Sequence, residues 1–168
     1  MTETLNLDLP PAIDHYVGVV LKEACERGLT LATAESCTGG LLASLLTDVE
    51  GCSHAFERAF VTYTDEAKHE MLGVPLELIR EKGAVSQEVA RAMAEGAVDR
   101  SRADVAIAIT GFAGPGAPGE EPGLVHFALR RRGRETVARE VHFGDIGRGG
   151  VRLACLRTAL EMLRRSIA

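Results

Sequence analysis

Polar side chains that could carry out chemistry begin directly after an apolar run near the start of the chain. The run 29–34 ends in ESCTGG (35–40), and a helical pattern of leucines starts at Leu41. This order predicts a strand, a tight polar turn and a helix. The turn places hydroxyls and backbone N–H groups at a helix N-terminus, where negative charge is favoured. Gly39 and Gly40 would let a ligand approach the backbone closely.

Two later segments also place polar groups where an apolar run ends. They are YTDEAK (63–68) and the loop TGFAGPGAPG (110–119), which holds too many glycines and prolines for a regular element. In open α/β sheets, ligands bind beyond the carboxyl ends of the strands. We therefore expect Ser36, Tyr63 and Thr110 to share one site.

The candidate chemistry of this site is nucleophilic catalysis. Its reactive side chains are Ser36, Thr38, Ser53, Tyr63, Thr110, Lys68 and Glu35. A serine nucleophile needs a base to take its proton, and no histidine stands in a serine–histidine–aspartate order. Lysine serves as base only where burial or a nearby cation lowers its pKa from about 10.4 toward neutrality. The alternative is that Ser36 and Thr38 only cap a helix and Lys68 lies on a solvated face.

The elements that must position these residues follow from hydrophobic periodicity. Helices are expected over 13–24, 41–46, 65–72, 75–83, 86–98 and 156–167, and strands over 29–34, 56–63, 105–109, 124–129 and 136–143. Their alternation predicts an α/β protein, a three-layer α/β/α sandwich with a mixed, mostly parallel sheet and an antiparallel hairpin. Residues 130–133 are expected in a solvated turn and residues 144–150 in a flexible loop. Residues 1–10 read as a loose leader and residues 11–168 as one domain.

Composition narrows the class of protein. A chain of 168 residues suits one domain with a real core, and a net charge of −5 argues against a nucleic-acid binder that relies on phosphate contacts. No apolar stretch is long enough to span a membrane, and no signal peptide is visible. The four cysteines show no metal-binding spacing, so reduced thiols in a cytoplasmic protein are expected. The sequence leaves a homo-oligomer open.

Several segments of the chain resemble the CinA C-terminal domain family, in the order in which that family carries them. They are TAESCTGG (33–40), LLTDVEGCS (45–53), FERAFVTYTDEAK (56–68), MLGV (71–74), GAVS (83–86), ADVAIAITGFAGPG (103–116) and FGD (143–145). The resemblance spans about residues 15–165. It implies a fold like that of anticodon-binding domains and a PncC-like amidohydrolase. Such an enzyme converts the carboxamide of nicotinamide mononucleotide (NMN) to the acid and ammonia in pyridine nucleotide recycling, with no cofactor or metal.

The resemblance also assigns roles to individual residues. It implies a serine nucleophile, either Ser36 or Ser53, with Lys68 as base and Tyr63 orienting the lysine or passing the proton. The residues expected to bind substrate are Thr38, Gly39, Gly40, Thr110, Gly111 and Arg148. Backbone N–H groups near Gly39 and Gly111 are candidates for an oxyanion hole.

Three positions depart from the usual pattern of the family. Asp65 stands where the family usually has asparagine, the segment 121–123 is shortened by loss of a lysine, and Ile146 replaces an arginine. Arg148 or Arg152 would then have to hold the substrate phosphate. The alternative function is a catalytically weakened module of the same family that binds a nucleotide or a partner and is linked to competence or the DNA-damage response.

Overall fold

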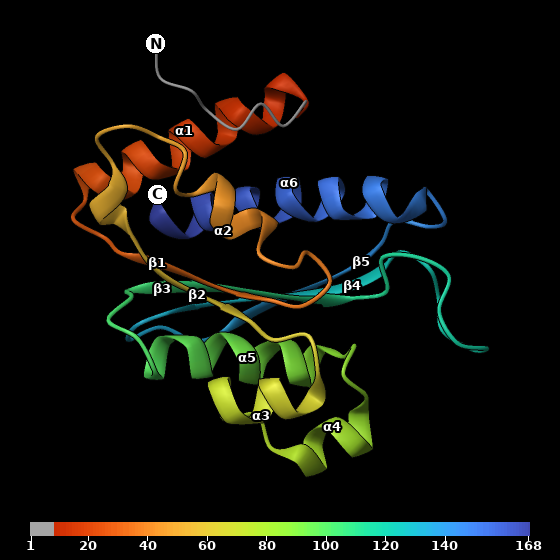
Figure 1. Cartoon of the computed structure of the whole chain (residues 1–168). Helices are drawn as coiled ribbons and strands as arrows, with labels where there is room; N and C mark the ends of the chain where they lie inside the picture. The colour runs from red at the N-terminus through yellow and green to blue at the C-terminus, as the bar shows by residue number, and fades with distance from the viewer. Residues whose placement is uncertain (1–8) are drawn as a thin grey trace.

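The computed structural model describes residues 9–168, which form six helices, one 3-10 turn and five strands (Figure 1). The helices are α1 (Pro11–Glu26), α2 (Leu41–Leu45), α3 (Asp65–Leu72), α4 (Leu76–Lys82), α5 (Gln87–Asp99) and α6 (Gly147–Ile167). The strands are β1 (Leu31–Glu35), β2 (Phe56–Val61), β3 (Val105–Gly111), β4 (Leu124–Arg131) and β5 (Val137–His142), and the 3-10 turn η1 is Ser53–Ala55. This order is the one that the periodicity predicts.

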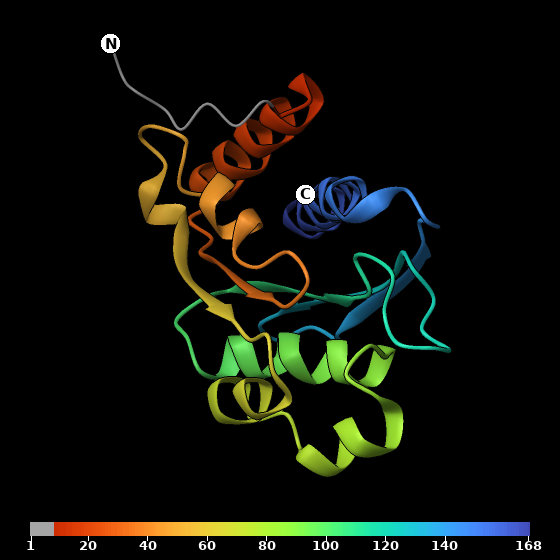
Figure 2. The ribbon, with the colours of Figure 1, turned by 45° about the vertical axis from the view of Figure 1, so that its right-hand side comes forward.

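The five strands form a single sheet in the order β2-β1-β3-β4-β5. β2, β1 and β3 pair in parallel, whereas β3–β4 and β4–β5 pair antiparallel. Helices α1, α2 and α6 cover one face and α3, α4 and α5 cover the other (Figures 1 and 2). The three-layer α/β/α sandwich with a mixed sheet and a hairpin is therefore confirmed. Because the three parallel strands are neighbours, their carboxyl ends meet at one edge of the sheet.

The two faces of the sheet carry side chains of different size, and β3 shows this most clearly. Ile107 and Ile109 pack into the core beneath α1 and α6, while Ala106 and Ala108 pack into the core beneath α5. Alternate residues of a strand point to opposite faces. The small residues on one face therefore let α5 pack closely against the centre of the sheet.

Two predicted boundaries near the carboxyl half are wrong. α6 begins at Gly147, so the second half of the expected flexible loop 144–150 is the first turn of a long helix. Packing overrides the weak helix propensity of glycine there, since Val151 of the next turn is buried in the core. Arg130 and Arg131, expected in a solvated turn, are the last residues of β4 and pair with Ala106 and Val105 of β3.

The expected leader, residues 1–10, lies outside the described residues except for its last two. Leu9 is partly buried and packs against the core beneath α1, so this end of the segment is not loose. All four cysteines are free. Across residues 9–168, none of the helices combines the length and the apolarity that a bilayer crossing requires.

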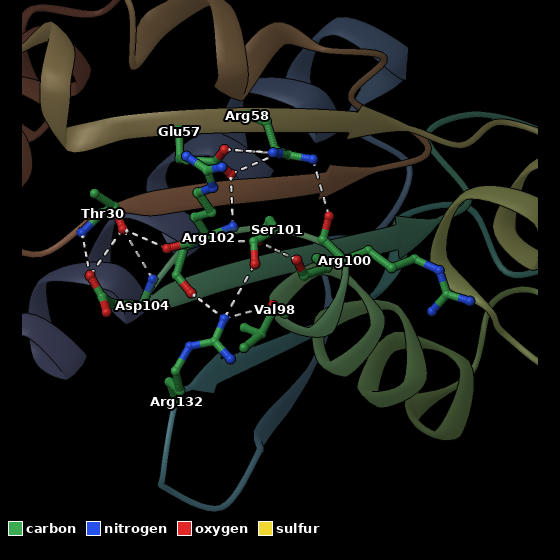
Figure 3. Close-up of polar contacts among 11 residues, drawn as sticks. Thr30, Glu57, Arg58, Val98, Arg100, Ser101, Arg102, Asp104 and Arg132 are labelled. Atoms are coloured by element: carbon green, nitrogen blue, oxygen red, sulfur yellow. Dashed lines mark hydrogen bonds and ion pairs between the residues drawn. The ribbon is translucent and has the colours of Figure 1, made fainter.

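The amino ends of the parallel strands are joined by a network of polar contacts (Figure 3). Asp104 Oδ2 accepts hydrogen bonds from both the backbone N–H and the hydroxyl of Thr30, each at 2.9 Å, and so joins the starts of β1 and β3. The Arg132 guanidinium donates to the carbonyls of Val98 at 2.9 Å and Ala103 at 3.1 Å, which closes the C-terminal end of α5. These side chains hold the fold together at the edge opposite to the strand ends that carry Ser36 and Thr110.

Glu35 organises the turn between β1 and α2. Its fully buried carboxylate accepts hydrogen bonds from the backbone N–H groups of Gly40 and Leu42, each at 3.1 Å, and of Ala43 at 2.8 Å. These are the N–H groups that begin α2. The helix N-terminus that the sequence offered to an anionic ligand is therefore occupied by the protein's own carboxylate.

Replacing Glu35 should measurably lower the stability of the protein. Glu35→Ala removes a charged acceptor from three buried or partly buried donors, so we expect the free energy of unfolding to fall by about 2–4 kcal/mol. Urea denaturation checks this value. Glu50→Ala, at an exposed acidic position after α2, is the matched control and should change the stability by less than about 0.5 kcal/mol. Equal small effects of the two substitutions would contradict the capping role.

Candidate active site

A cavity of about 230 Å³ lies at the carboxyl ends of the parallel strands. Among the residues predicted to form the site, those that line it are Ser36, Tyr63, Lys68, Thr110, Gly111 and Arg148. The structure thus brings together groups from the turn after β1, the segment after β2, the end of β3 and the first turn of α6. This is the edge at which the sequence placed the site.

The centre of the cavity wall is a contact between Ser36 and Lys68. The Lys68 Nζ lies 3.3 Å from the Ser36 Oγ and donates a hydrogen bond to the Thr62 carbonyl at 3.1 Å. Lys68 is only 1% exposed and Ser36 is 8% exposed. Within residues 9–168, no carboxylate lies at ion-pair distance from the Lys68 amine.

Burial lowers the pKa of Lys68 below its usual value, while the charges of Asp65 and Cys37 act in the opposite direction. A buried ammonium without a carboxylate partner is costly, so burial shifts Lys68 toward the neutral amine relative to a lysine in water. A neutral Lys68 keeps N–H groups for the Thr62 carbonyl and has a lone pair for the hydroxyl proton of Ser36. The pair therefore has the chemistry of a nucleophile and its base.

Helix α3 directs Lys68 into the protein. Thr64 caps the helix, since its hydroxyl accepts a hydrogen bond from the Ala67 N–H at 3.1 Å, and Gly73 ends it with φ 71°. Lys68 and Leu72, four residues apart, are its buried residues. Positions four apart share one helix face. Lys68 thus lies on the buried face of α3, and the solvated position considered from the sequence is wrong.

The structure does not bring Ser53 to this cavity. Ser53 is exposed in η1, directly before β2, whereas Ser36 directly follows β1. Because β1 and β2 are parallel, the two serines lie at opposite edges of the sheet. β2 has six residues, and each advances about 3.3 Å, so the separation is roughly 20 Å.

Thr38, Gly39 and Gly40 shape the turn and do not line the cavity. The Thr38 carbonyl accepts a hydrogen bond from Arg152 Nη2 at 3.0 Å. The Gly39 N–H donates to the Ser36 carbonyl at 3.0 Å, and the Gly40 N–H is held by the carboxylate that caps α2. The N–H of Gly39 is therefore engaged and is a poor oxyanion donor.

Gly111 lies at a close approach of β3 to β4. A Cβ atom at this position would lie 2.7 Å from Val125 Cγ2 and 2.8 Å from the Leu124 carbonyl oxygen, so glycine is required sterically. The Phe112 N–H donates to that same carbonyl at 2.9 Å. Since successive N–H groups of a strand point to opposite sides, the N–H of Gly111 points away from β4, toward the Ser36 turn.

Two other predicted residues line the cavity in different ways. Thr110 is 1% exposed, and its hydroxyl donates to the Ala84 carbonyl at 2.8 Å, which fixes the end of β3 to the segment before α5. Arg148 is exposed on the first turn of α6. The buried threonine acts as a positioning group, and the exposed guanidinium is available to an anionic part of a ligand.

Several residues that line the cavity were not predicted as site residues from the sequence, among them Asp65, Phe112 and Glu120. The first follows Tyr63 closely in the sequence, and the other two belong to the glycine- and proline-rich loop or its edge. Position near the three strand ends was the available signal. Within the described part of the chain, no group of three or more histidine, cysteine, aspartate or glutamate side chains is arranged to hold a metal ion.

A second cavity, of about 400 Å³, lies between the β4–β5 hairpin and the C-terminal end of α6. Arginines line it, and two of them already have partners: Arg131 donates to the Ser166 carbonyl, and Arg139 pairs with Glu161 at 3.6 Å. No lysine, histidine or cysteine is among its lining residues. It contains one serine, Ser166, but no lysine that could act as its base, which distinguishes it from the smaller cavity.

The proteins that this chain resembles in sequence are CinA-like and competence-damage inducible proteins. The family model of the CinA C-terminal domain matches residues 14–167. A competence-damage inducible protein of Symbiobacterium thermophilum is 54% identical over an alignment of 151 positions, and the match covers 83% of this chain and 35% of that protein. A CinA-like protein of Mycobacterium sp. (strain MCS) is 51% identical over 92% of this chain and 36% of its own length. The chain thus spans about a third of the length of these curated relatives.

Solved structures match over almost the whole chain. The crystal structure of a competence/damage inducible protein from Agrobacterium tumefaciens superimposes with a TM-score of 0.90 at 44% identity, covering 99% of both chains. A CinA superfamily protein from Escherichia coli gives a TM-score of 0.85 at 36% identity, covering 98% of this chain and 94% of its own.

Proposed function

This chain belongs to the CinA C-terminal domain family, and we propose that it hydrolyses the carboxamide of NMN to nicotinic acid mononucleotide and ammonia. The observation that carries the proposal is the 3.3 Å contact between the Ser36 Oγ and the buried amine of Lys68. A serine next to a desolvated lysine is a nucleophile with its base. The amide as substrate is the expectation that the family resemblance raised.

In the first half of the reaction, the Ser36 Oγ attacks the carboxamide carbon while the neutral Lys68 amine takes the hydroxyl proton. The carbonyl oxygen becomes an oxyanion in the tetrahedral intermediate. Lys68 then gives its proton to the departing nitrogen, and ammonia leaves. The product of this half is an ester between Ser36 and the nicotinic acid nucleotide.

In the second half, water attacks the ester carbonyl and Lys68 again takes the proton. Collapse of the second tetrahedral intermediate breaks the ester bond and returns the proton to the Ser36 oxygen. The carboxylic acid product gives its proton to solvent and leaves as a carboxylate. Tyr63 lines the cavity beside Lys68 but is 62% exposed, so we assign it to substrate contact and not to proton transfer.

Two further groups of the cavity suit NMN as the substrate, one for its carboxamide oxygen and one for its phosphate. The N–H of Gly111 points toward the Ser36 turn and is our candidate to stabilise the oxyanion. Arg148 is exposed on the cavity lining and is our candidate to bind the phosphate. Guanidinium groups suit phosphate because they donate in a planar fork.

Ammonia release from NMN by the purified protein tests this proposal. We expect release from NMN in the presence of a chelator, with free nicotinamide as the control substrate. No release together with a thermal shift on NMN addition would contradict the amidase. That result would favour the non-catalytic nucleotide-binding module. No release and no binding would contradict both functions.

A further inference from the structure

The charged residues of the cavity leave it with an excess of negative charge when Lys68 is neutral. The other charged lining residues are Asp65, Glu120 and Arg148, so two carboxylates face one guanidinium. Glu120 has a partner in its own loop, because its Oε2 accepts a hydrogen bond from the Ala117 N–H at 2.8 Å. Asp65 has no side-chain hydrogen bond or ion pair within residues 9–168. Its carboxylate therefore remains for a ligand.

Helix α3 does not depend on Asp65 for its start. Thr64 caps the helix, and Glu66 supplies a second carboxylate in the same first turn. Glu66 is exposed like Asp65 but does not line the cavity. The N-terminus of α3 therefore does not need Asp65, and stability of the helix does not explain why this carboxylate lines the cavity.

We propose that Asp65 is the specificity-determining residue that selects carboxamides carried by a cationic ring. This inference rests on the proposed function. In NMN the carboxamide is bonded to the same six-membered ring that contains the positively charged nitrogen. Ser36 and Asp65 line the same cavity, so an amide carbon held at the Ser36 Oγ brings the ring charge into the cavity that Asp65 lines. The ring of free nicotinamide is neutral and gains nothing from this carboxylate.

The same pairing acts on the base. The groups that face Lys68 are the neutral Ser36 hydroxyl and Thr62 carbonyl, Asp65 from its own helix, and Cys37 from the turn after β1. In the free enzyme the Asp65 charge raises the pKa of Lys68 and so opposes the effect of burial. A cationic ring beside Asp65 offsets that charge and favours the neutral amine. The substrate charge thereby helps to prepare the base that its own hydrolysis requires.

Binding measurements in a Ser36→Ala background separate charge recognition from turnover. The two probes are NMN and benzamide riboside 5′-phosphate, which has a similar shape but a neutral ring. Adding Asp65→Asn should weaken NMN binding roughly two- to fivefold, as expected for one exposed charge pair, and leave the neutral probe unchanged. Adding Glu66→Gln removes the same charge one residue away and should change neither affinity. Calorimetry measures the affinity of each of the three proteins for each of the two probes.

Each result has a definite meaning. Equal weakening of both probes by Asp65→Asn would show that the residue reads shape and not charge, which overturns the inference. Unchanged NMN binding in Asp65→Asn would also overturn the inference. In that case, ammonia release from NMN by the enzyme with Ser36 intact would show that the proposed function still stands. Absence of NMN binding in every variant would overturn the inference and the proposed substrate together.

The pH dependence of turnover gives a second readout that a merely structural role would not move. Asp65→Asn removes a charge that raises the pKa of Lys68, so the acid limb of kcat/KM should move to lower pH. Glu66→Gln should leave this limb in place. An unmoved acid limb in Asp65→Asn would contradict the influence of Asp65 on the base.

Discussion

Ser36→Ala should lower kcat for ammonia release from NMN by about 10³-fold or more, because it removes the oxygen that forms the bond to the carboxamide carbon. NMN binding should change little, since the hydroxyl is small and its partner in the structure is the Lys68 amine. Steady-state kinetics and calorimetry check the two parts. The fold should remain intact, as Ser36 is held in the turn by its backbone: its N–H donates to the Ile109 carbonyl at 3.0 Å.

Ser53→Ala is the matched control for this experiment. Ser53 is exposed in η1 at the opposite edge of the sheet, so its substitution should leave kcat within about twofold of the original enzyme. A large loss in Ser53→Ala with full activity in Ser36→Ala would reverse our assignment of the nucleophile.

Lys68→Met should have an opposite effect on activity and on stability. Turnover should fall by about 10³-fold or more, because, among residues 9–168, no other group within hydrogen-bond distance of the Ser36 Oγ can take its proton. The free energy of unfolding should rise by about 1 kcal/mol or more. Methionine fills a similar volume and removes a buried ionisable group that has no charged partner. Urea denaturation of both proteins measures the second effect.

The stability gain from Lys68→Met should depend on pH with a definite sign. The pKa of Lys68 is lower in the folded state than in the unfolded chain. Between these two pKa values the unfolded chain binds one more proton, so the stability of the unsubstituted protein rises with pH in this window. The advantage of Lys68→Met should be full below the folded pKa and disappear as the pH approaches the unfolded pKa, about 10.4.

Lys22→Met serves as the control for both measurements. Lys22 is 76% exposed on α1 and forms only a surface ion pair with Glu26 at 3.9 Å. Such pairs contribute little, so activity should be retained and stability should change by less than about 0.5 kcal/mol at every pH. If Lys68→Met changed the free energy of unfolding as little as the control, or by the same amount at every pH, the lowered pKa of the buried amine would be contradicted.

Much of the fold could be predicted because its signals are local. The continuous apolar run of β3 is typical of a strand covered on both faces, and Ser86 caps the helix that follows it, since its hydroxyl accepts a hydrogen bond from the Val89 N–H. The first turn of α6 escaped prediction because its glycines are weak helix formers. Only the packing of the following turns against the sheet stabilises helix there.

The sequence by itself determined that Ser36 and Tyr63 follow strand ends and that Thr110 lies at a third, because hydrophobic period and turn residues mark those ends. It could not decide between Ser36 and Ser53 as nucleophile. Ser36 lies in the turn after a strand, whereas Ser53 is nearer to Lys68 along the sequence. The parallel pairing of β1 and β2 decides it, by sending the two serines to opposite edges of the sheet. Tertiary packing also decides the state of Lys68: a lysine gains the low pKa of a base only when other parts of the chain exclude water from its amine.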